Sequence, residues 1–313
     1  MRVGITGGTG FIGEYLIRDY GEKIQFVAPV IENPIDISRA EYRVSDYSVD
    51  SLRYFFEGCD AVIHLAAKVA KRNAMQMTMD EYIQNTVLTA NVFEACRLNG
   101  INNIIHASSR SIFDWSNNIL SRTINEKDIP KPQNAYGVSK VCDEILAEFY
   151  NNVYGMKIKS YRMAEVCGYD LKYGMINAFW DAALKNCVEG KSIKVYGTGL
   201  AGRDLLYVKD AARAFYMGLY RGEKGVYHIG SGELTTNKDI AYEFCRVFDN
   251  KSGIELLADK EEWGTSGVLN VEKASIELGF HTEYGLPQII RDIKVEYIKC
   301  SKNKEIKFES PLS

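Results

Sequence analysis

The stretch Thr6-Gly7-Gly8-Thr9-Gly10-Phe11-Ile12-Gly13 directly follows a short apolar segment, Val3 to Ile5. Its spaced glycines predict a tight turn between a first β-strand and a first α-helix. Gly7 allows the turn, Gly10 lets a ligand approach the backbone, and Gly13 lets the helix pack against the strand. The positive end of the helix then faces a phosphate group. The stretch therefore indicates a site for a dinucleotide, NAD or NADP.

The glycine-rich turn begins a regular alternation of strand and helix patterns. Apolar strand candidates occur at Arg2 to Thr6, Ile24 to Ala28, Tyr42 to Ser45, Ala61 to Ala66, Asn103 to Ala107 and Ile158 to Arg162. Segments with helical periodicity separate them, and the longest are Asp80 to Asn99 and Ala135 to Tyr154. This alternation predicts an α/β fold, a Rossmann-type doubly wound parallel sheet with helices on both faces.

The length of 313 residues exceeds the roughly 250 at which single cores divide, so we expect two units. Residues 1–167, with parts of 204–230, are expected to form the NAD(P)-binding Rossmann domain. Residues 168–203 and 231–300 are expected to form a smaller α/β substrate-binding lobe, with short helices near 177–189 and 236–249. The polar residues 301–313 are expected to be a frayed tail.

The composition excludes several classes of function. A net charge of −3 without a basic stripe argues against a nucleic-acid partner. Seven cysteines occur without a CxxC pair or zinc-ligand spacing, so no metal site is expected. No apolar run approaches the ~18 residues of a membrane span, and the chain begins with a strand rather than a leader. We therefore expect no membrane partner and a cytoplasmic protein.

Two groups of residues suggest chemistry. Tyr136 and Lys140 are four residues apart, on one face of the predicted helix. A nearby ammonium group stabilises a phenolate, so Tyr136 is a candidate for proton exchange with a substrate hydroxyl. Ser108 and Ser109 follow a strand at its carboxyl end, where ligands of doubly wound sheets bind. Each group also has a structural alternative, a solvated helix face or a serine-rich turn.

Together these motifs resemble the extended short-chain dehydrogenases/reductases, in their nucleotide-sugar epimerase/dehydratase branch. The motifs that carry the resemblance are the glycine run, Asp60 to Ala67, Asn85, Ser108-Ser109, Tyr136 with Lys140, Arg162 to Gly168, Gly197 to Gly199, Arg203 to Val208, His228 to Gly232, and Lys273 to Gly279. They cover nearly the whole chain, and their combination is more specific than any one of them.

The resemblance implies roles for individual residues. Ser109 would hydrogen-bond the reacting hydroxyl, Tyr136 would be the acid/base, and Lys140 would hold the nicotinamide ribose and tune Tyr136. Ser108 and Arg203 would contact the substrate, Arg203 through a phosphate; a structural ion pair is the alternative for Arg203. The residues implied at the cofactor are Gly7, Gly10, Phe11, Ile12, Gly13, Asp46, Tyr47, Leu65, Ala66, Ala67, Asn85, Ala107, Tyr136 and Lys140.

The sequence also departs from the family pattern. Glu165 replaces the Asn of the RxxNxxG segment, and a carboxylate there repels a diphosphate unless it turns away or pairs with a cation. Arg110-Ser111 replaces the Asp-Glu pair of 4,6-dehydratases, which disfavours dehydration. Phe113-Asp114 stands where Tyr-Gly is frequent. Glu32 comes late for the acidic residue of NAD enzymes, which leaves the choice between NAD and NADP open.

The leading hypothesis is an NAD-dependent epimerase of a nucleotide sugar, of the UDP-sugar 4-epimerase type, acting through a transient 4-keto intermediate. An alternative is an NADPH-dependent reductase of a 4-keto sugar or another carbonyl compound, since the same residues serve both reactions. A third is a non-catalytic dinucleotide-binding regulator, against which Ser109, Tyr136 and Lys140 argue. By analogy with the family, the two long helices suggest a homodimer.

Overall fold

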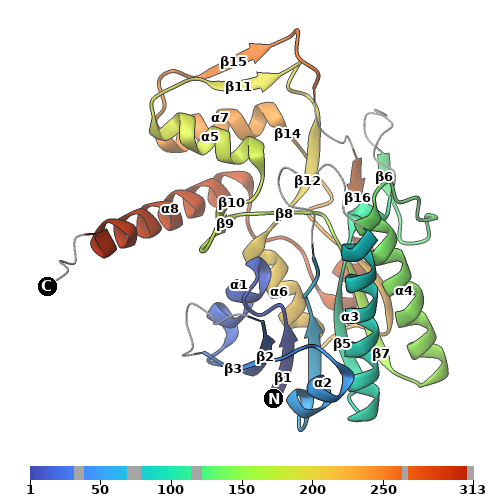
Figure 1. The fold of residues 1–313 in the computed structure, drawn as a ribbon. Coiled ribbons are helices and arrows are strands. Elements are labelled where there is room, and N and C mark those ends of the chain that lie inside the picture. Colours follow the sequence, from blue (N-terminus) through green and yellow to red (C-terminus); the bar gives the residue numbers. More distant parts are fainter. Residues whose placement is uncertain (32–38, 69–78, 114–121, 263–266, 309–313) are drawn as a thin grey trace, which may run out of the picture.

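The computed structural model describes residues 1–31, 39–68, 79–113, 122–262 and 267–308 (Figure 1). Its centre is a seven-stranded sheet in the order β13-β7-β5-β4-β1-β2-β3, and every neighbouring pair is parallel. The strands are β1 (Arg2–Thr6), β2 (Gln25–Val30), β3 (Ala40–Val44), β4 (Ala61–His64), β5 (Asn103–Ser109), β7 (Lys157–Met163) and β13 (Gly225–Ile229). The order reverses between β1 and β4, which makes this edge of the sheet a ligand crevice.

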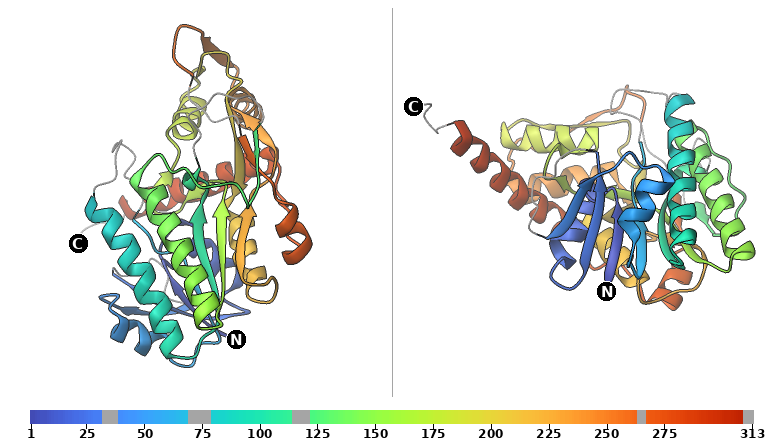
Figure 2. Two further views of the ribbon diagram at one scale, coloured as in Figure 1. Left: turned by 90° about the vertical axis from the view of Figure 1, so that its right-hand side faces the viewer. Right: turned by 60° about the horizontal axis from the view of Figure 1, so that its bottom comes forward.

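Helices cover both faces of this sheet, as the views of Figure 2 show. One layer contains α2 (Val49–Phe56), α3 (Met79–Leu98) and α4 (Ala135–Val153), and the other contains α1 (Phe11–Tyr20) and α6 (Val208–Gly218). Alternate residues of a strand therefore enter different cores. Val62 packs with the α2–α4 layer, whereas Ile63 packs with the α1 layer. The expected doubly wound α/β fold is confirmed.

A smaller lobe lies beyond the carboxyl ends of the large sheet, at the top of Figure 1. Its main layer packs α5 (Ala178–Val188) and α7 (Asn237–Phe248) against a parallel pair, β11 (Ile193–Tyr196) and β15 (Ile254–Leu257). The remaining short strands are β6 (Arg122–Ile124), β8 (Glu165–Cys167), β9 (Tyr169–Asp170), β10 (Gly174–Met175), β12 (Gly202–Tyr207), β14 (Leu234–Thr236) and β16 (Gly267–Leu269). β8, β12 and β14 form a sheet between this layer and the large sheet.

Two element boundaries differ from those that the sequence analysis expects. β2 does not end at Ala28 but continues through Pro29 to Val30. Beyond Val27, β2 pairs only with β3. Pro29 has no backbone N–H, but at this point β1 offers no carbonyl that would need one. Glu32 lies outside the described residues.

The second difference is at residue 301, where the sequence analysis expects a frayed tail to begin. Helix α8 (Leu286–Phe308) continues past that point. Pro287 lies in its first turn, and no glycine or proline follows until Pro311, so the sequence permits one long helix. Residues 309–313 lie outside the described residues. Within the described part of the chain, every helix falls short of the combined length and apolarity that a membrane crossing requires.

Candidate active site

A cavity of about 650 Å³ lies beside the glycine-rich turn, at the carboxyl ends of β1 and β4. It brings together seven residues that the sequence analysis assigns to the cofactor: Gly7, Gly10, Asp46, Tyr47, Ala66, Ala67 and Asn85. Its volume is within the range of small-molecule and cofactor sites. Phe11, Leu65 and Ala107 do not line it and pack in or against the core.

Gly7 and Gly13 have no room for a side chain, whereas Gly10 borders open space. Gly7 has φ +73°, and a Cβ added there would lie 2.7 Å from the Ala66 backbone nitrogen. A Cβ on Gly13 would lie 2.2 Å from the Gly7 oxygen, so this glycine lets α1 pack on the turn. A Cβ on Gly10 would meet only the Gly7 oxygen, at 3.2 Å, and otherwise open space. The turn therefore fits a diphosphate that approaches the backbone at Gly10, where α1 begins.

The Asn85 side chain is hydrogen-bonded to the backbone of Lys68, in the segment that follows β4. Its side chain accepts a hydrogen bond from the Lys68 backbone N–H (2.7 Å) and donates one to the Lys68 carbonyl (2.9 Å). Both residues line the cofactor cavity. The sequence analysis identifies Asn85 and misses Lys68, although a lysine one residue after the Ala66-Ala67 pair was a visible signal for an anion site.

A second cavity, of about 460 Å³, contains two of the three predicted catalytic residues, Ser109 and Tyr136. Ile12, Ser108, Ser109, Tyr136 and Arg203 all line it. Ile12 is two residues from Gly10 along the turn, so this catalytic cavity adjoins the cofactor cavity.

The two serines at the end of β5 have different partners. The Ser109 hydroxyl accepts from the Ser111 N–H (3.1 Å) and caps a 3₁₀ turn, Arg110–Ile112. Ser108 is fully buried, and its hydroxyl donates to Glu144 of α4 (2.5 Å), which also pairs with Arg162 (2.7 Å). The geometry therefore leaves Ser109 as the stronger candidate for a substrate contact and gives Ser108 a hydrogen bond that ties β5 to α4.

Tyr136 is fixed by the way α4 begins. The Asn134 side chain caps the helix by accepting from the Gly137 N–H (2.8 Å). A Cβ on Gly137 would lie 2.1 Å from the Ser111 oxygen, so the first turn of α4 packs directly on the 3₁₀ turn. This packing brings Tyr136 and Ser109 into the same cavity. Lys140 lies one turn further along, with its Nζ 5.8 Å from the centre of the Tyr136 ring.

Lys140 does not line the cavity wall but belongs to a group that we call the buried cluster, which consists of His64, His106, Lys140 and Asp143. The Lys140 ammonium donates to Asp143 Oδ2 (3.2 Å), which also lies 3.5 Å from His106 Nε2. The His106 ring stacks on His64 with centroids 5.5 Å apart.

The protonation states in the buried cluster follow from burial and charge. Burial alone would raise the pKa of Asp143, but Lys140 and His106 outweigh it and lower this pKa. Burial lowers the pKa of His106, and burial, His106 and Lys140 lower the pKa of His64 well below its usual value. At neutral pH the cluster is therefore one ion pair flanked by two neutral imidazoles.

A second group, which we call the arginine cluster, contains Arg110, Glu165, Arg203 and Asn177. Glu165 pairs with Arg203 Nε (2.7 Å), accepts from Asn177 Nδ2 (2.7 Å) and lies 3.9 Å from Arg110 Nη1. Burial lowers the pKa of Arg110 to about 10. Glu165 thus meets the condition that the sequence analysis sets for it, because it is paired with a cation. Asp114 lies outside the described residues.

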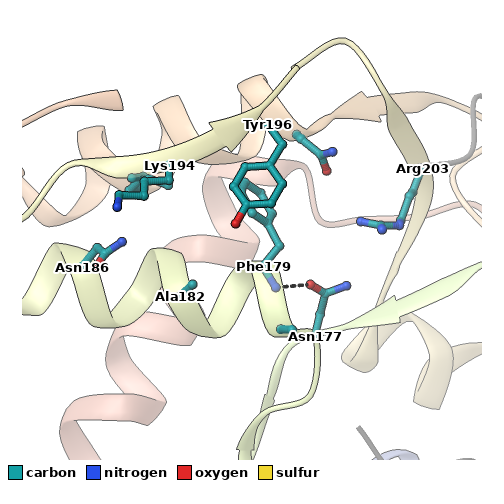
Figure 3. Close-up of a pocket in the computed structure, with 10 residues that line it drawn as sticks. Asn177, Phe179, Ala182, Asn186, Lys194, Tyr196 and Arg203 are labelled. Atoms are coloured by element: carbon teal, nitrogen blue, oxygen red, sulfur yellow. Dashed lines mark hydrogen bonds between the residues drawn. The ribbon is translucent and has the colours of Figure 1, made fainter. Parts of the chain in front are cut away.

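Arg203 connects the catalytic cavity to a third one, of about 480 Å³, in the smaller lobe (Figure 3). Figure 3 shows Arg203 at one end of this outer cavity and Lys194 and Asn186 toward the other. Phe179 and Tyr196 line it between them. The sequence analysis misses these residues, because aromatic side chains on short elements give no distinctive pattern.

Asp204, next to Arg203, is almost completely buried. It accepts hydrogen bonds from the backbone N–H groups of Ser231 (2.8 Å) and Leu269 (3.0 Å). It therefore orients the loops around β12. Among the described residues, no group of three or more His, Cys, Asp or Glu side chains is arranged to hold a metal ion.

Comparisons with known proteins agree with this geometry. Residues 3–230 match the model of the NAD dependent epimerase/dehydratase family. The chain is 28% identical to a putative UDP-glucose 4-epimerase of Methanocaldococcus jannaschii, over 92% of this chain and 96% of that protein. It is 27% identical to dTDP-4-dehydro-6-deoxyglucose reductase of Escherichia coli, over 93% and 96%.

Among solved structures, UDP-N-acetylglucosamine 4-epimerase from Bacillus cereus has 30% identity and a TM-score of 0.81, covering 94% of this chain and 98% of that one. The similarity thus extends over both the large sheet and the smaller lobe. Together with the match of the family model to more than half of the sequence, it shows that this chain belongs to the NAD-dependent epimerase/dehydratase family.

Proposed function

We propose that the protein is an NAD-dependent epimerase of a nucleotide sugar, of the UDP-sugar 4-epimerase type, acting through a transient 4-keto intermediate. The observation that carries the proposal is the position of Arg203, which lines both the catalytic cavity and the aromatic outer cavity. This order of sites matches the order of groups in a nucleotide sugar. The nucleoside would lie between Phe179 and Tyr196, the diphosphate at Arg203, and the sugar beside Tyr136.

In this proposal Tyr136 takes the proton of the hydroxyl at carbon 4, and Ser109 hydrogen-bonds the same oxygen. NAD, when bound, supplies a hydride acceptor and donor. Lys140 lies behind Tyr136, held by Asp143, and stabilises the phenolate. After the keto sugar has turned its other face, Tyr136 returns the proton to the oxygen. Asp46 adds a carboxylate to the cofactor cavity beside Tyr47, and in this proposal it lies near the adenosine, where it would repel the additional phosphate of NADP.

The test is to incubate the purified protein with a panel of UDP- and dTDP-hexoses without added cofactor and to follow carbon 4 by proton NMR. We expect a mixture of the two C4 epimers and a loss of about a thousandfold in rate for Tyr136→Phe. The matched control is Tyr242→Phe, on the exposed face of α7, which should keep full activity. Absence of any epimer across the panel would contradict the proposal.

The relationship to the Escherichia coli reductase favours a second candidate, the NADPH-dependent reduction of a 4-keto sugar. The two reactions differ in stoichiometry. A reductase consumes one NADPH for each keto sugar, whereas an epimerase uses none. A non-catalytic regulator, the third possibility, would show neither reaction and would keep its cellular effect in Tyr136→Phe.

We also propose that the protein is a homodimer that pairs through α3 and α4. These helices pack together, and α4 exposes the apolar side chains of Ile145, Phe149 and Val153. Such a face is typical of an interface between helices. Sedimentation should give a dimer for the wild type and a monomer for Ile145→Asp, and a wild-type monomer would contradict the proposal.

A further inference from the structure

A short hairpin lies beside the glycine-rich turn, although the two are far apart in the sequence. β9 pairs antiparallel with β10, and Lys172 and Tyr173 lie in the turn between them. Figure 1 shows the hairpin next to the start of α1. Lys172 and Tyr173 line the cofactor cavity together with Thr9 and Gly10. The wall of this cavity is therefore not built from the large sheet alone.

The base of the hairpin is anchored on α1. The Tyr15 hydroxyl donates to the Tyr169 carbonyl (2.8 Å), and Tyr15 is fully buried. Gly168, which precedes β9, has φ +144°, and a Cβ there would lie 3.2 Å from the Phe11 ring. The hairpin thus packs on the helix whose first turn follows Gly10, and its position relative to the glycine-rich turn is fixed.

The tip is also held in one conformation. The Asp170 carboxylate accepts from the backbone N–H groups of Lys172 (2.8 Å) and Tyr173 (2.7 Å). Gly174 has φ +78°, a value that favours glycine, and it returns the chain into β10. Asp170 is 4% exposed, so this local network is shielded from water.

Charged side chains of both signs lie near this part of the cavity. Glu14 lies in the first turns of α1, and burial and the nearby Asp170 raise its pKa to about 7, while Lys172 and Arg18 act in the opposite direction. The Glu14 carboxylate on α1 and the Asp170 carboxylate on β9 would both repel an anion bound beside Gly10. Lys172 is the positive group that the hairpin brings to the same side of the cavity.

We propose that the β9–β10 hairpin is part of the cofactor site and that the Lys172 ammonium contacts the pyrophosphate of the bound dinucleotide. Tyr173 covers the same part of the cavity from the solvent side. This inference rests on the proposed function only in taking the cofactor cavity as a dinucleotide site. It adds a phosphate contact from outside the glycine-rich turn, supplied by the segment that follows β8.

The experiment measures dissociation constants of ADP, NAD and adenosine for the wild type and for Lys172→Ala by calorimetry. We expect Lys172→Ala to bind ADP and NAD about tenfold more weakly at low salt and to bind adenosine as the wild type does. Lys172→Arg should restore most of the affinity, and 1 M NaCl should reduce the difference. The matched control is Lys191→Ala, an exposed lysine beside Glu189 in the smaller lobe.

Unchanged binding of ADP and NAD by Lys172→Ala would overturn the inference, and so would an equal loss for adenosine. Wild-type protein that binds ADP but neither NAD nor NADP would overturn the proposed function, while the comparison with ADP would still decide the role of Lys172. Binding of none of these ligands by the wild type would overturn both.

Discussion

Two groups of charged residues flank the catalytic cavity, and they are built differently. In the buried cluster, Lys140 and Asp143 are three residues apart on one helix, and at most 2% of either side chain is exposed to solvent. In the arginine cluster, Arg110, Glu165 and Arg203 come from three separate elements and keep part of their surface exposed. The Lys140–Asp143 pair is therefore local in the sequence and shielded from water. The arginine cluster joins residues from distant segments and is partly exposed to water.

This difference separates two tasks. The Lys140–Asp143 pair cannot rearrange without leaving a charge buried, so it fixes the position of the ammonium group behind Tyr136. In the arginine cluster, Nη1 of Arg203 is buried and has no hydrogen-bond partner among the described residues. It can therefore donate a hydrogen bond to an anionic oxygen while Nε stays with Glu165. In the proposed function, the side of the cavity next to Tyr136 is preformed, and the side next to Arg203 retains an unused hydrogen-bond donor for the ligand.

The largest expected effect comes from breaking the buried cluster. Asp143→Asn leaves the Lys140 charge buried without a counter-ion, and we expect it to lower the free energy of unfolding by about 3 kcal/mol. Asp181→Asn is the matched control, because Asp181 pairs with Lys185 on α5 in an exposed position (2.9 Å) and should cost about 0.5 kcal/mol. Urea denaturation at pH 7 measures both.

The pH dependence sharpens this prediction. The folded protein lowers the pKa of Asp143, so the stabilisation is complete above the unfolded pKa of about 4 and is lost as the pH falls through the lower, folded value. The deficit of Asp143→Asn should therefore persist unchanged from pH 7 to pH 5. Equal losses for Asp143→Asn and Asp181→Asn would show that the buried pair has no special role.

A smaller effect is expected from the arginine cluster, and on binding rather than on stability. Arg203→Ala removes the proposed phosphate contact, and we expect the Kd for UDP to rise about thirtyfold with little change in Tm. Glu165→Gln changes the same site in the opposite direction, because it removes the negative charge beside Arg203. We expect it to tighten UDP binding severalfold.

Calorimetric titration with UDP measures both variants, and uridine serves as the ligand without phosphate. If Arg203→Ala destabilised the fold as strongly as Asp143→Asn, the two clusters would not differ in their effect on stability as proposed. Weaker UDP binding by Glu165→Gln would contradict the assignment of Arg203 to a phosphate.

The smallest effect is expected at Glu14, where a carboxylate is half-buried and burial dominates. Because its pKa is raised to about 7, the folded protein binds a proton that the unfolded chain releases between about pH 4.5 and 7. The destabilisation of the fold by the charged Glu14 carboxylate is therefore complete above pH 7 and decreases as the pH falls. Glu14→Gln should stabilise the protein by about 1 kcal/mol at pH 8, after allowance for solvent screening, and hardly at all at pH 5.

Thermal unfolding at the two pH values checks this, with the exposed Glu57→Gln as a control that should change little. The expected sign is opposite to that of Asp143→Asn. A destabilised Glu14→Gln at pH 8 would mean that the carboxylate has a cation partner strong enough to outweigh its burial.

Local patterns carried most of the information in the sequence. The spaced glycines and the alternating apolar segments predict the doubly wound sheet. Both patterns involve only residues that are close together in the sequence, so they can be read without knowing the fold. Pairings between distant elements were not predictable in the same way. The contact of Glu165 with Arg203 and Asn177 depends on how β8, β12 and α5 come together, and the hairpin beside Gly10 depends on its packing against α1.

The Lys140–Asp143 pair is an intermediate case. Its spacing of three residues on a predicted helix was visible, and such pairs commonly contact each other. What the sequence did not reveal was its burial, since that depends on His106 and His64 from two neighbouring strands.

The central claim is that a hydride leaves carbon 4 of the sugar and returns to the same carbon, while Tyr136 moves the proton. The most direct test uses UDP-glucose carrying deuterium at carbon 4, with no added cofactor and with mass and NMR analysis of the sugar nucleotides. The account predicts UDP-galactose that keeps the deuterium at carbon 4, and no such product with Tyr136→Phe. Loss of the label to solvent, or conversion that requires one added NADPH per sugar, would contradict it.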